Sequence, residues 1–386
     1  MNMVRSFLPV GQGAFYLEQF GLDDETRINV VYDCGSYGDS KPVEEQIRRS
    51  FVKGETIHAV FISHLHSDHI NGLPYLVRYC DVKNIYFPLI TSKYKPYMSI
   101  YSKITHAGGL VEAFIAGEPE RIFSALESGQ VALHPIGVDE SAGDNWIEDE
   151  VDVSVEVFGP SSVLTKKHEW LYIPFNFECD TRAKMLKDAL DKAFPGKAID
   201  GKVLEEIWEK GTPADRDKIK EAYRSVRGDF NTNSMVLFSG ETTGRYVQEP
   251  VCVNHLYVRR WGHSGCLGCL SRRKCLGCMV DLSRAGWLYT GDYDTTGVRK
   301  WNQIWDKYRR YRELIGGVQI PHHGSRHNYN PDLTRFGYKY AVISAGENNI
   351  FRHPHKGVLK DLLLRRKAVF WVNEKEETEA CFYIHD

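Results

Sequence analysis

The sequence predicts an α/β fold in which layers of sheet and helix alternate, and two observations lead to that class. Short runs rich in β-branched and aromatic residues, separated by glycine and polar turns, predict strands at residues 4–10, 13–20 and 27–36. A strand–helix–strand alternation follows as far as residue 90, which is typical of layered α/β proteins. With 386 residues, 42% of them hydrophobic, the chain can bury a sizeable core.

The remaining elements follow from the same periodicities. Residues 42–51 read as a helix that begins at a proline, and residues 58–63 as a buried strand. Residues 298–315 predict one long amphipathic helix with its tyrosines packed inward. Further short elements are a helix at 72–80 and strands at 83–90, 233–240, 286–292, 317–321, 340–346 and 368–372.

Two segments interrupt this alternation. Residues 181–228 are highly charged with a helical period, so we expect a helical insertion there. Residues 252–283 carry a cluster of cysteines and form a second, smaller insertion. We therefore expect a single layered domain over residues 1–386 that carries both insertions.

Charge and hydropathy narrow the function classes. The formal net charge of -2 gives no global attraction for nucleic acid, so any anion-binding surface must be local. The first residues lack the apolar core of a secretory signal, and no apolar run approaches the length of a membrane span. Five of the nine cysteines are scattered, which suits a reducing compartment. We expect a soluble cytoplasmic protein that makes no membrane contact.

The stretch FISHLHSDHINGL crowds three histidines and an aspartate behind an apolar strand. Imidazole and carboxylate are ligands that suit zinc or manganese. On a loop that leaves a strand, His64 and His66 can converge on one ion while Asp68 and His69 turn back to meet a second. The alternative is a histidine-rich surface loop, which the strand before and the helix after the motif disfavour. The spacing predicts a dinuclear site in which a hydroxide bridges the two metals.

The HLHSDH motif resembles the signature of the metallo-β-lactamase fold, a four-layer αβ/βα sandwich that usually carries a dinuclear site. Other motifs follow in that family's order: VVYDCGS, YTGD, PHHGS and ISAGENNIFRHPH. The series N-x-NS-x-VL, TGD, PHHGS and S-x-G-x-NN…HPH is similar to the hydrolase domain of ComEC-type competence proteins. The resemblance covers most of the chain apart from the two insertions.

The resemblance implies roles for individual residues. Asp292 matches the family's bridging aspartate, and Asp68 could accept a proton from the attacking water. His322 or His323 could donate a proton to the leaving group. The implied metal ligands are His64, His66, Asp68, His69, Asp292, His323 and His353, with Asn233, Asp33, His355 and Ser325 as additional site residues.

Each additional residue also has a structural interpretation. Asn233 stands where many relatives carry a histidine, and it could instead form a hydrogen bond to the turn. Asp33 could support the ligands from behind or form a turn. His353 and His355 could cap the helix predicted after them.

The cysteine cluster CLGCLSRRKCLGC contains two C-x-x-C pairs, and four thiolates make a closed tetrahedral zinc site. We expect one structural zinc; a redox pair or an iron–sulfur cluster is the alternative. Basic residues on this insertion could hold the phosphate backbone of nucleic acid, or could simply keep the loop solvated. The cysteines are Cys266, Cys269, Cys275 and Cys278, and the basic residues are Arg259, Arg260, Arg272, Arg273 and Lys274.

The preferred interpretation is a metal-dependent hydrolase with two divalent ions, zinc or manganese, acting as a phosphodiesterase or nuclease on nucleic acid. One alternative is a metallohydrolase of a small ester, lactone or phosphorylated metabolite, because this fold hosts many reactions. Another is a component of a multi-protein system that docks through the zinc insertion. An exposed apolar patch around residues 204–208 would favour that last role.

Overall fold

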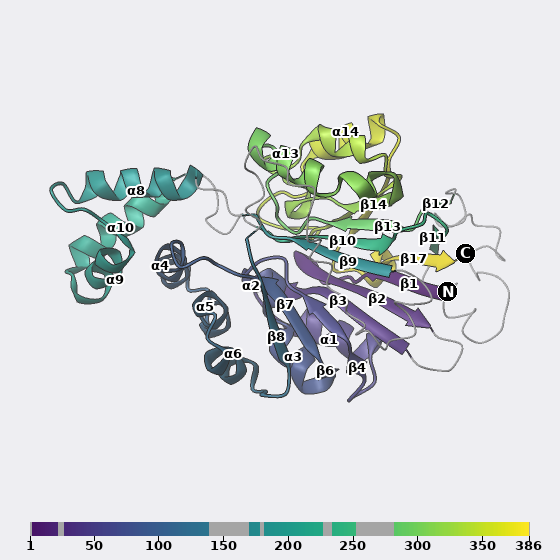
Figure 1. The fold of residues 1–386 in the computed structure, drawn as a ribbon, viewed down its shortest axis with the longest axis horizontal. Helices are drawn as coiled ribbons and strands as arrows, with labels where there is room; N and C mark the ends of the chain where they lie inside the picture. The colour runs from purple at the N-terminus through teal and green to yellow at the C-terminus, as the bar shows by residue number, and fades with distance from the viewer. Residues whose placement is uncertain are drawn as a thin grey trace.

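A computed structural model describes residues 2–21, 27–138, 170–177, 181–226, 234–251 and 282–385, which form two large sheets packed face to face (Figure 1). The first has nine strands in the order β12-β11-β17-β1-β2-β3-β5-β7-β8. Its strands β3, β5, β7 and β8 run parallel, so their carboxyl ends reach one edge. The strands are β1 (Asn2–Phe7), β2 (Gly13–Gly21), β3 (Arg27–Ser36), β5 (Ala59–Phe61), β7 (Asn84–Pro88), β8 (Ala132–Ile136), β11 (Val247–Val251), β12 (Ser283–Arg284) and β17 (Ala380–His385).

The second sheet has six strands in the order β16-β15-β14-β13-β10-β9. Strands β13 to β16 are parallel to one another, whereas β9 and β10 are antiparallel neighbours. A two-stranded ribbon of β4 (Thr56–Ile57) and β6 (Asp81–Val82) lies apart from both sheets in the pairing order. The six strands are β9 (Trp170–Phe175), β10 (Val236–Glu241), β13 (Gly286–Tyr289), β14 (Ile315–Gln319), β15 (Tyr340–Ser344) and β16 (Ala368–Val372).

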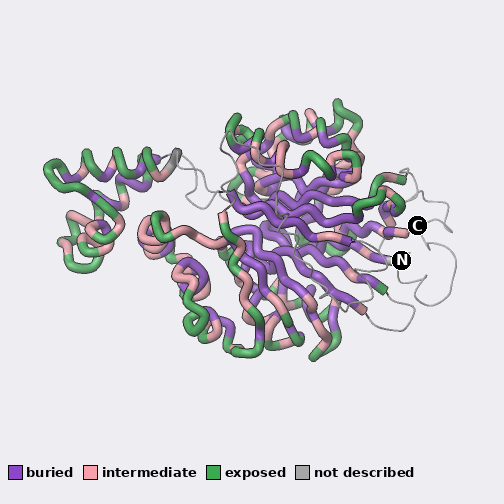
Figure 2. Tube along the Cα trace, viewed as in Figure 1, coloured by how far each residue is buried: buried purple, intermediate pink, exposed green. Residues whose placement is uncertain are grey.

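Helices cover the outer face of each sheet, which gives the four layers that the sequence predicts. One buried cluster fills the space between the sheets and draws Tyr16 and Tyr32 from one sheet and Trp287 and Tyr289 from the other. Figure 2 shows the buried strands between more exposed outer helices. The helices on the nine-stranded sheet are α1 (Lys41–Ser50), α3 (Leu73–Tyr79), α5 (Gly109–Ala116) and α6 (Pro119–Leu126); α13 (Val298–Lys307) and α14 (Lys356–Leu364) cover the other sheet.

The helices of residues 181–226 lie between β9 and β10 in the chain and pack against α4 (Lys95–Thr105) through Ile100 and a shared apolar cluster. Leu204 is fully buried in this cluster, and Trp208 is partly buried against it. The apolar patch that would have favoured a docking role is therefore not exposed here. The helices are α8 (Thr181–Ala193), α9 (Gly201–Lys210) and α10 (Pro213–Ser225).

The helix expected over residues 298–315 is shorter than predicted. The α-helix ends at Lys307, and a 3-10 helix continues over Arg309–Leu314. Tyr308 is fully buried and its hydroxyl donates to the backbone oxygens of Ile173 and Val236. Tyr311 is also buried, as predicted. The tighter winding brings tyrosines three residues apart to the same side of the helix, toward the sheet.

No helix among the described residues is both long and apolar enough to cross a membrane. Residues 252–281 of the cysteine-rich insertion, with its four cysteines and five basic residues, lie outside the described residues, and so does Asn233.

Candidate metal centre

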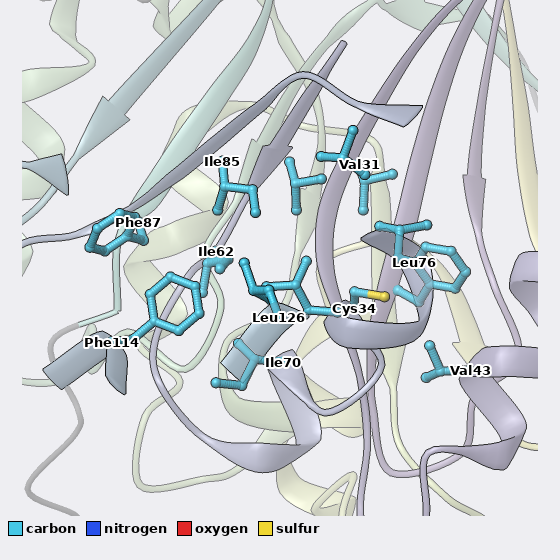
Figure 3. Packing of buried hydrophobic residues seen from close by; sticks show 14 of the residues in the cluster. Val31, Cys34, Val43, Ile62, Ile70, Leu76, Ile85, Phe87, Phe114 and Leu126 are labelled. Atoms are coloured by element: carbon cyan, nitrogen blue, oxygen red, sulfur yellow. The ribbon is translucent and has the colours of Figure 1, made fainter. Parts of the chain in front are cut away.

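The histidine-rich loop is delivered to the sheet edge by a strongly anchored strand. Strand β5 is fully buried, and Ile62 and Ile70 continue its apolar packing on both sides of the loop (Figure 3). The backbone nitrogen of Met235 donates to the oxygen of Ser63 at 2.6 Å, which ties the loop to the second sheet. The short helix α2 (Ser67–Ile70) then turns Asp68 and His69 back toward the strand end.

Among the described residues, two groups of side chains have ligand atoms within 4.8 Å of one another. One group contains His64, His66 and Asp292, and the other contains Asp68, His69 and His323. Asp292 faces both groups. Its Oδ2 lies 3.5 Å from His64 Nε2, while its Oδ1 lies 3.5 Å from His69 Nε2. The sequence motifs therefore meet where the carboxyl ends of β5, β13 and β14 converge.

Three buried atoms in this cluster have no hydrogen-bond partner among the described residues: His69 Nε2, His323 Nε2 and Asp292 Oδ1. Such atoms are costly to leave unpaired in a protein interior. A divalent cation would satisfy nitrogen and carboxylate oxygen together, and the donor set of imidazole and carboxylate suits zinc or manganese. The residues present therefore fit the metals that the sequence predicts.

A second layer of residues fixes which ring nitrogen faces the cluster. Asp33 is fully buried near the carboxyl end of β3 and accepts hydrogen bonds from the Ser63 nitrogen and hydroxyl, both at 2.7 Å. His69 donates from Nδ1 to Asp33 at 2.8 Å, which leaves its Nε2 free. The Ser63 hydroxyl also lies 2.9 Å from Nδ1 of His64, whose Nε2 faces the cluster. This is the arrangement that metal-binding histidines usually show.

His323 is oriented in the same way from the second sheet. Its Nδ1 donates to the backbone oxygen of Ser344 at 2.7 Å, and its Nε2 lies 3.4 Å from Asp68. The backbone nitrogen of Asp292 donates to the Ser234 hydroxyl at 2.9 Å. Strand ends of both sheets thus hold the side chains in place.

Electrostatics keep the carboxylates of the cluster ionised. Burial by itself would raise the pKa of Asp68, but the neighbouring His69 and His323 outweigh it, and the pKa lies below its usual value. Burial likewise opposes ionisation of Asp292, yet the surrounding imidazoles, His322 foremost, hold its pKa well below the usual range. Both side chains are therefore available as anionic ligands.

The other predicted residues lie at varying distances from the cluster. His322 Nε2 is 3.5 Å from Asp292, but His322 belongs to neither group of ligands. The ring of His353 is 5.7 Å from that of His322 and is also outside both groups. His355 caps α14 by accepting from the Gly357 nitrogen, and Ser325 accepts from the nitrogen of His327.

Four members of the two ligand groups, His66, Asp68, Asp292 and His323, line a cleft of about 480 Å³. Its walls include α4 and α5 together with the loops that follow β1, β3 and β15. Sequence reasoning missed Ser63 and three residues of this cleft, namely Gln12, Tyr37 and Phe351. Only Ser63 carried a usable signal, because it directly precedes His64.

Comparisons with known proteins found three similarities. Residues 22–165 match the model of the Metallo-beta-lactamase superfamily. ComE operon protein 3 of Bacillus subtilis (strain 168) is 30% identical over 84 residues, which span 22% of this chain and 10% of that protein. The structure of a long form RNase Z from yeast aligns with a TM-score of 0.34 and 12% identity, covering 91% of this chain and 38% of that one. Over residues 22–165 the chain therefore matches the metallo-β-lactamase superfamily.

Proposed function

We propose that this metallo-β-lactamase superfamily hydrolase is a metal-dependent phosphodiesterase that acts on nucleic acid. The observation that carries the proposal is a pair of adjacent three-residue ligand groups, with Asp292 facing both. Two adjacent cations suit an in-line displacement at phosphorus, because charge develops on both the attacking and the leaving oxygen. The motif series that resembles ComEC-type hydrolase domains favours the same chemistry.

Each ligand group would hold one divalent ion: His64, His66 and Asp292 the first, and Asp68, His69 and His323 the second, with Asp292 facing both. When bound, the ions would lower the pKa of water and neutralise charge on the phosphoryl group. Asp68 lines the cleft as an ionised carboxylate and is placed to accept the proton of the attacking water.

His322 is the residue that we assign to the leaving group. It lines the cleft, is 29% exposed, and stands outside both ligand groups, so its ring is free to face substrate. The Oδ2 of Asp292 lies 3.5 Å from the Nε2 of His322. His322 would donate a proton to the departing oxygen. The ring of His323 is committed elsewhere, because its Nδ1 bonds to Ser344 and its Nε2 belongs to the second ligand group.

A substrate panel tests the proposal: single- and double-stranded DNA, RNA, cyclic nucleotides and model esters, each with Mn²⁺ or Zn²⁺ and again with chelator. We expect phosphodiester cleavage that chelator abolishes and that Asp68→Ala or Asp292→Ala reduces by at least about a hundredfold. Asp217→Ala, which changes an exposed carboxylate on α10, is the matched control. Turnover of esters with inert phosphodiesters would refute the substrate class, and full activity of Asp68→Ala would refute the mechanism.

A further inference from the structure

A row of aromatic rings begins beside Asp292 and ends at two exposed rings that line the cleft. His322 lies beside Asp292, and the ring of His353 is 5.7 Å from that of His322. Phe351 stacks on His353 with ring centroids 6.1 Å apart and planes at 15°. Tyr37 meets Phe351 edge to face at 5.3 Å. The rings come from three separate loops, so the fold itself brings this row together.

The two outermost rings are unusually accessible. Tyr37 is 52% exposed and Phe351 is 47% exposed, although both line the cleft. Leaving large apolar surface in water gains nothing for the fold, because its burial is worth about 25 cal/mol per Å². Exposed aromatic side chains beside the candidate metal ligands are therefore available to pack against a planar ring of the substrate.

A polar group completes the same surface. Gln12 lines the cleft and is 8% exposed, and its Oε1 has no hydrogen-bond partner among the described residues. Its backbone oxygen accepts from the nitrogen of Tyr37 at 2.5 Å, so the two residues are held side by side. A buried, unpartnered amide oxygen can accept a hydrogen bond from an N–H on the edge of a bound ring.

We propose that Tyr37, Phe351 and Gln12 form a nucleobase subsite for a nucleotide joined to the scissile phosphate. Its base stacks on the face of one ring, meets the other, perpendicular ring edge to face and donates a hydrogen bond to the amide. The inference deepens the proposed phosphodiesterase function and rests on it. Stacking recognises the face that every base shares, so the subsite would favour nucleic acid over a small phosphate ester without selecting a sequence.

The test compares a thymidine dinucleotide with the same sugar–phosphate lacking both bases. For the wild-type enzyme we expect the abasic substrate to have a KM about tenfold higher, from the loss of base stacking. Phe351→Ala and Tyr37→Ala should raise the KM of the dinucleotide about tenfold, leave its kcat within about twofold, and leave the abasic KM unchanged. Phe351→Tyr keeps a ring and should restore the wild-type KM.

Ile350→Ala is the matched control, because Ile350 adjoins Phe351, is 75% exposed and does not line the cleft. Equal losses on both substrates would overturn the subsite, since they would mean that the ring only positions His353. If no phosphodiester is cleaved, the proposed function fails separately. The subsite is then tested by equilibrium binding of thymidine monophosphate against deoxyribose phosphate: a base-dependent affinity that Phe351→Ala removes supports it, and equal affinities overturn it.

Discussion

Gly35 controls how closely the metal-binding loop can approach strand β3. A Cβ atom added at this position would lie 2.4 Å from the backbone carbon of Asp68 and 2.4 Å from the backbone nitrogen of His69. Ordinary contact begins at 3.4 Å, so Gly35→Ala would push the loop outward by about 1.0 Å. The obstacle is backbone and cannot move aside as a flexible side chain would. Two residues of one ligand group would therefore shift together.

The displacement has two expected consequences. Overpacking of this kind costs about 1–3 kcal/mol in the free energy of unfolding. A shift of about 1 Å in reacting groups lowers activity by on the order of a hundredfold. The metal affinity of the second ligand group should fall more than that of the first, because Asp68 and His69 move whereas His64 stays just after β5.

Metal content, measured by mass spectrometry after dialysis, should fall by about one ion per chain in Gly35→Ala, and urea unfolding should show the loss of stability. Gly109→Ala is the control: an added Cβ there meets no atom within 4 Å, and alanine should stabilise helix α5 slightly. A Gly35→Ala protein with unchanged metal content, stability and activity would refute the claim that close packing against this glycine sets the ligand geometry.

Three further predictions concern the supporting structure. Asp33→Ala removes the hydrogen-bond acceptor behind His69 and should weaken metal affinity about 10–100-fold in competition with a chelator; unchanged affinity would contradict this role. Glu18→Ala leaves Arg5 charged and fully buried between the sheets and should cost about 3–5 kcal/mol in urea unfolding. Glu127→Ala, which breaks an exposed ion pair, should change stability by less than about 1 kcal/mol, and equal effects in the two variants would refute the contrast. Thr212→Ala removes the capping box of α10 and should destabilise that helix by about 1 kcal/mol, seen as faster amide exchange in its first turn; unaltered exchange would argue against the cap.

The four layers were predictable because their signals are local and periodic. Strand β5 reads as an apolar run, and the ligand spacing that follows it needs only a loop and a turn of helix to bring His64 and His69 together. The position of Asp292 beside them depends on long-range packing of the two sheets. The sequence suggested it only through the order of motifs, since spacing along the chain carries no information about contacts between distant strands.

The cleft was beyond sequence reasoning for a physical reason. Tyr37 and Phe351 stand on different loops, and neither belongs to a periodic pattern. An isolated exposed aromatic residue is ordinary on a protein surface. Such a residue indicates a binding site only when the fold places a second ring 5.3 Å away and candidate metal ligands in the same cleft. The 3-10 continuation after Lys307 was missed similarly, because the Tyr308 hydroxyl there bonds to the backbone of two distant strands, a contact that local periodicity does not carry.

The structure separates the two groups of candidate metal ligands from the helical wall of the cleft. The ligands stand at strand ends, held by Asp33, Ser63 and backbone groups. The wall includes Tyr101 of α4, which lines the cleft and stacks on Tyr223 of α10 at 6.0 Å. Tyr223 also donates to the backbone oxygen of Tyr97 at 2.7 Å. A change in the helical insertion would therefore reach the cleft wall while leaving the ligand groups in place. Under the proposed function, substrate choice could then vary independently of the metal ligands.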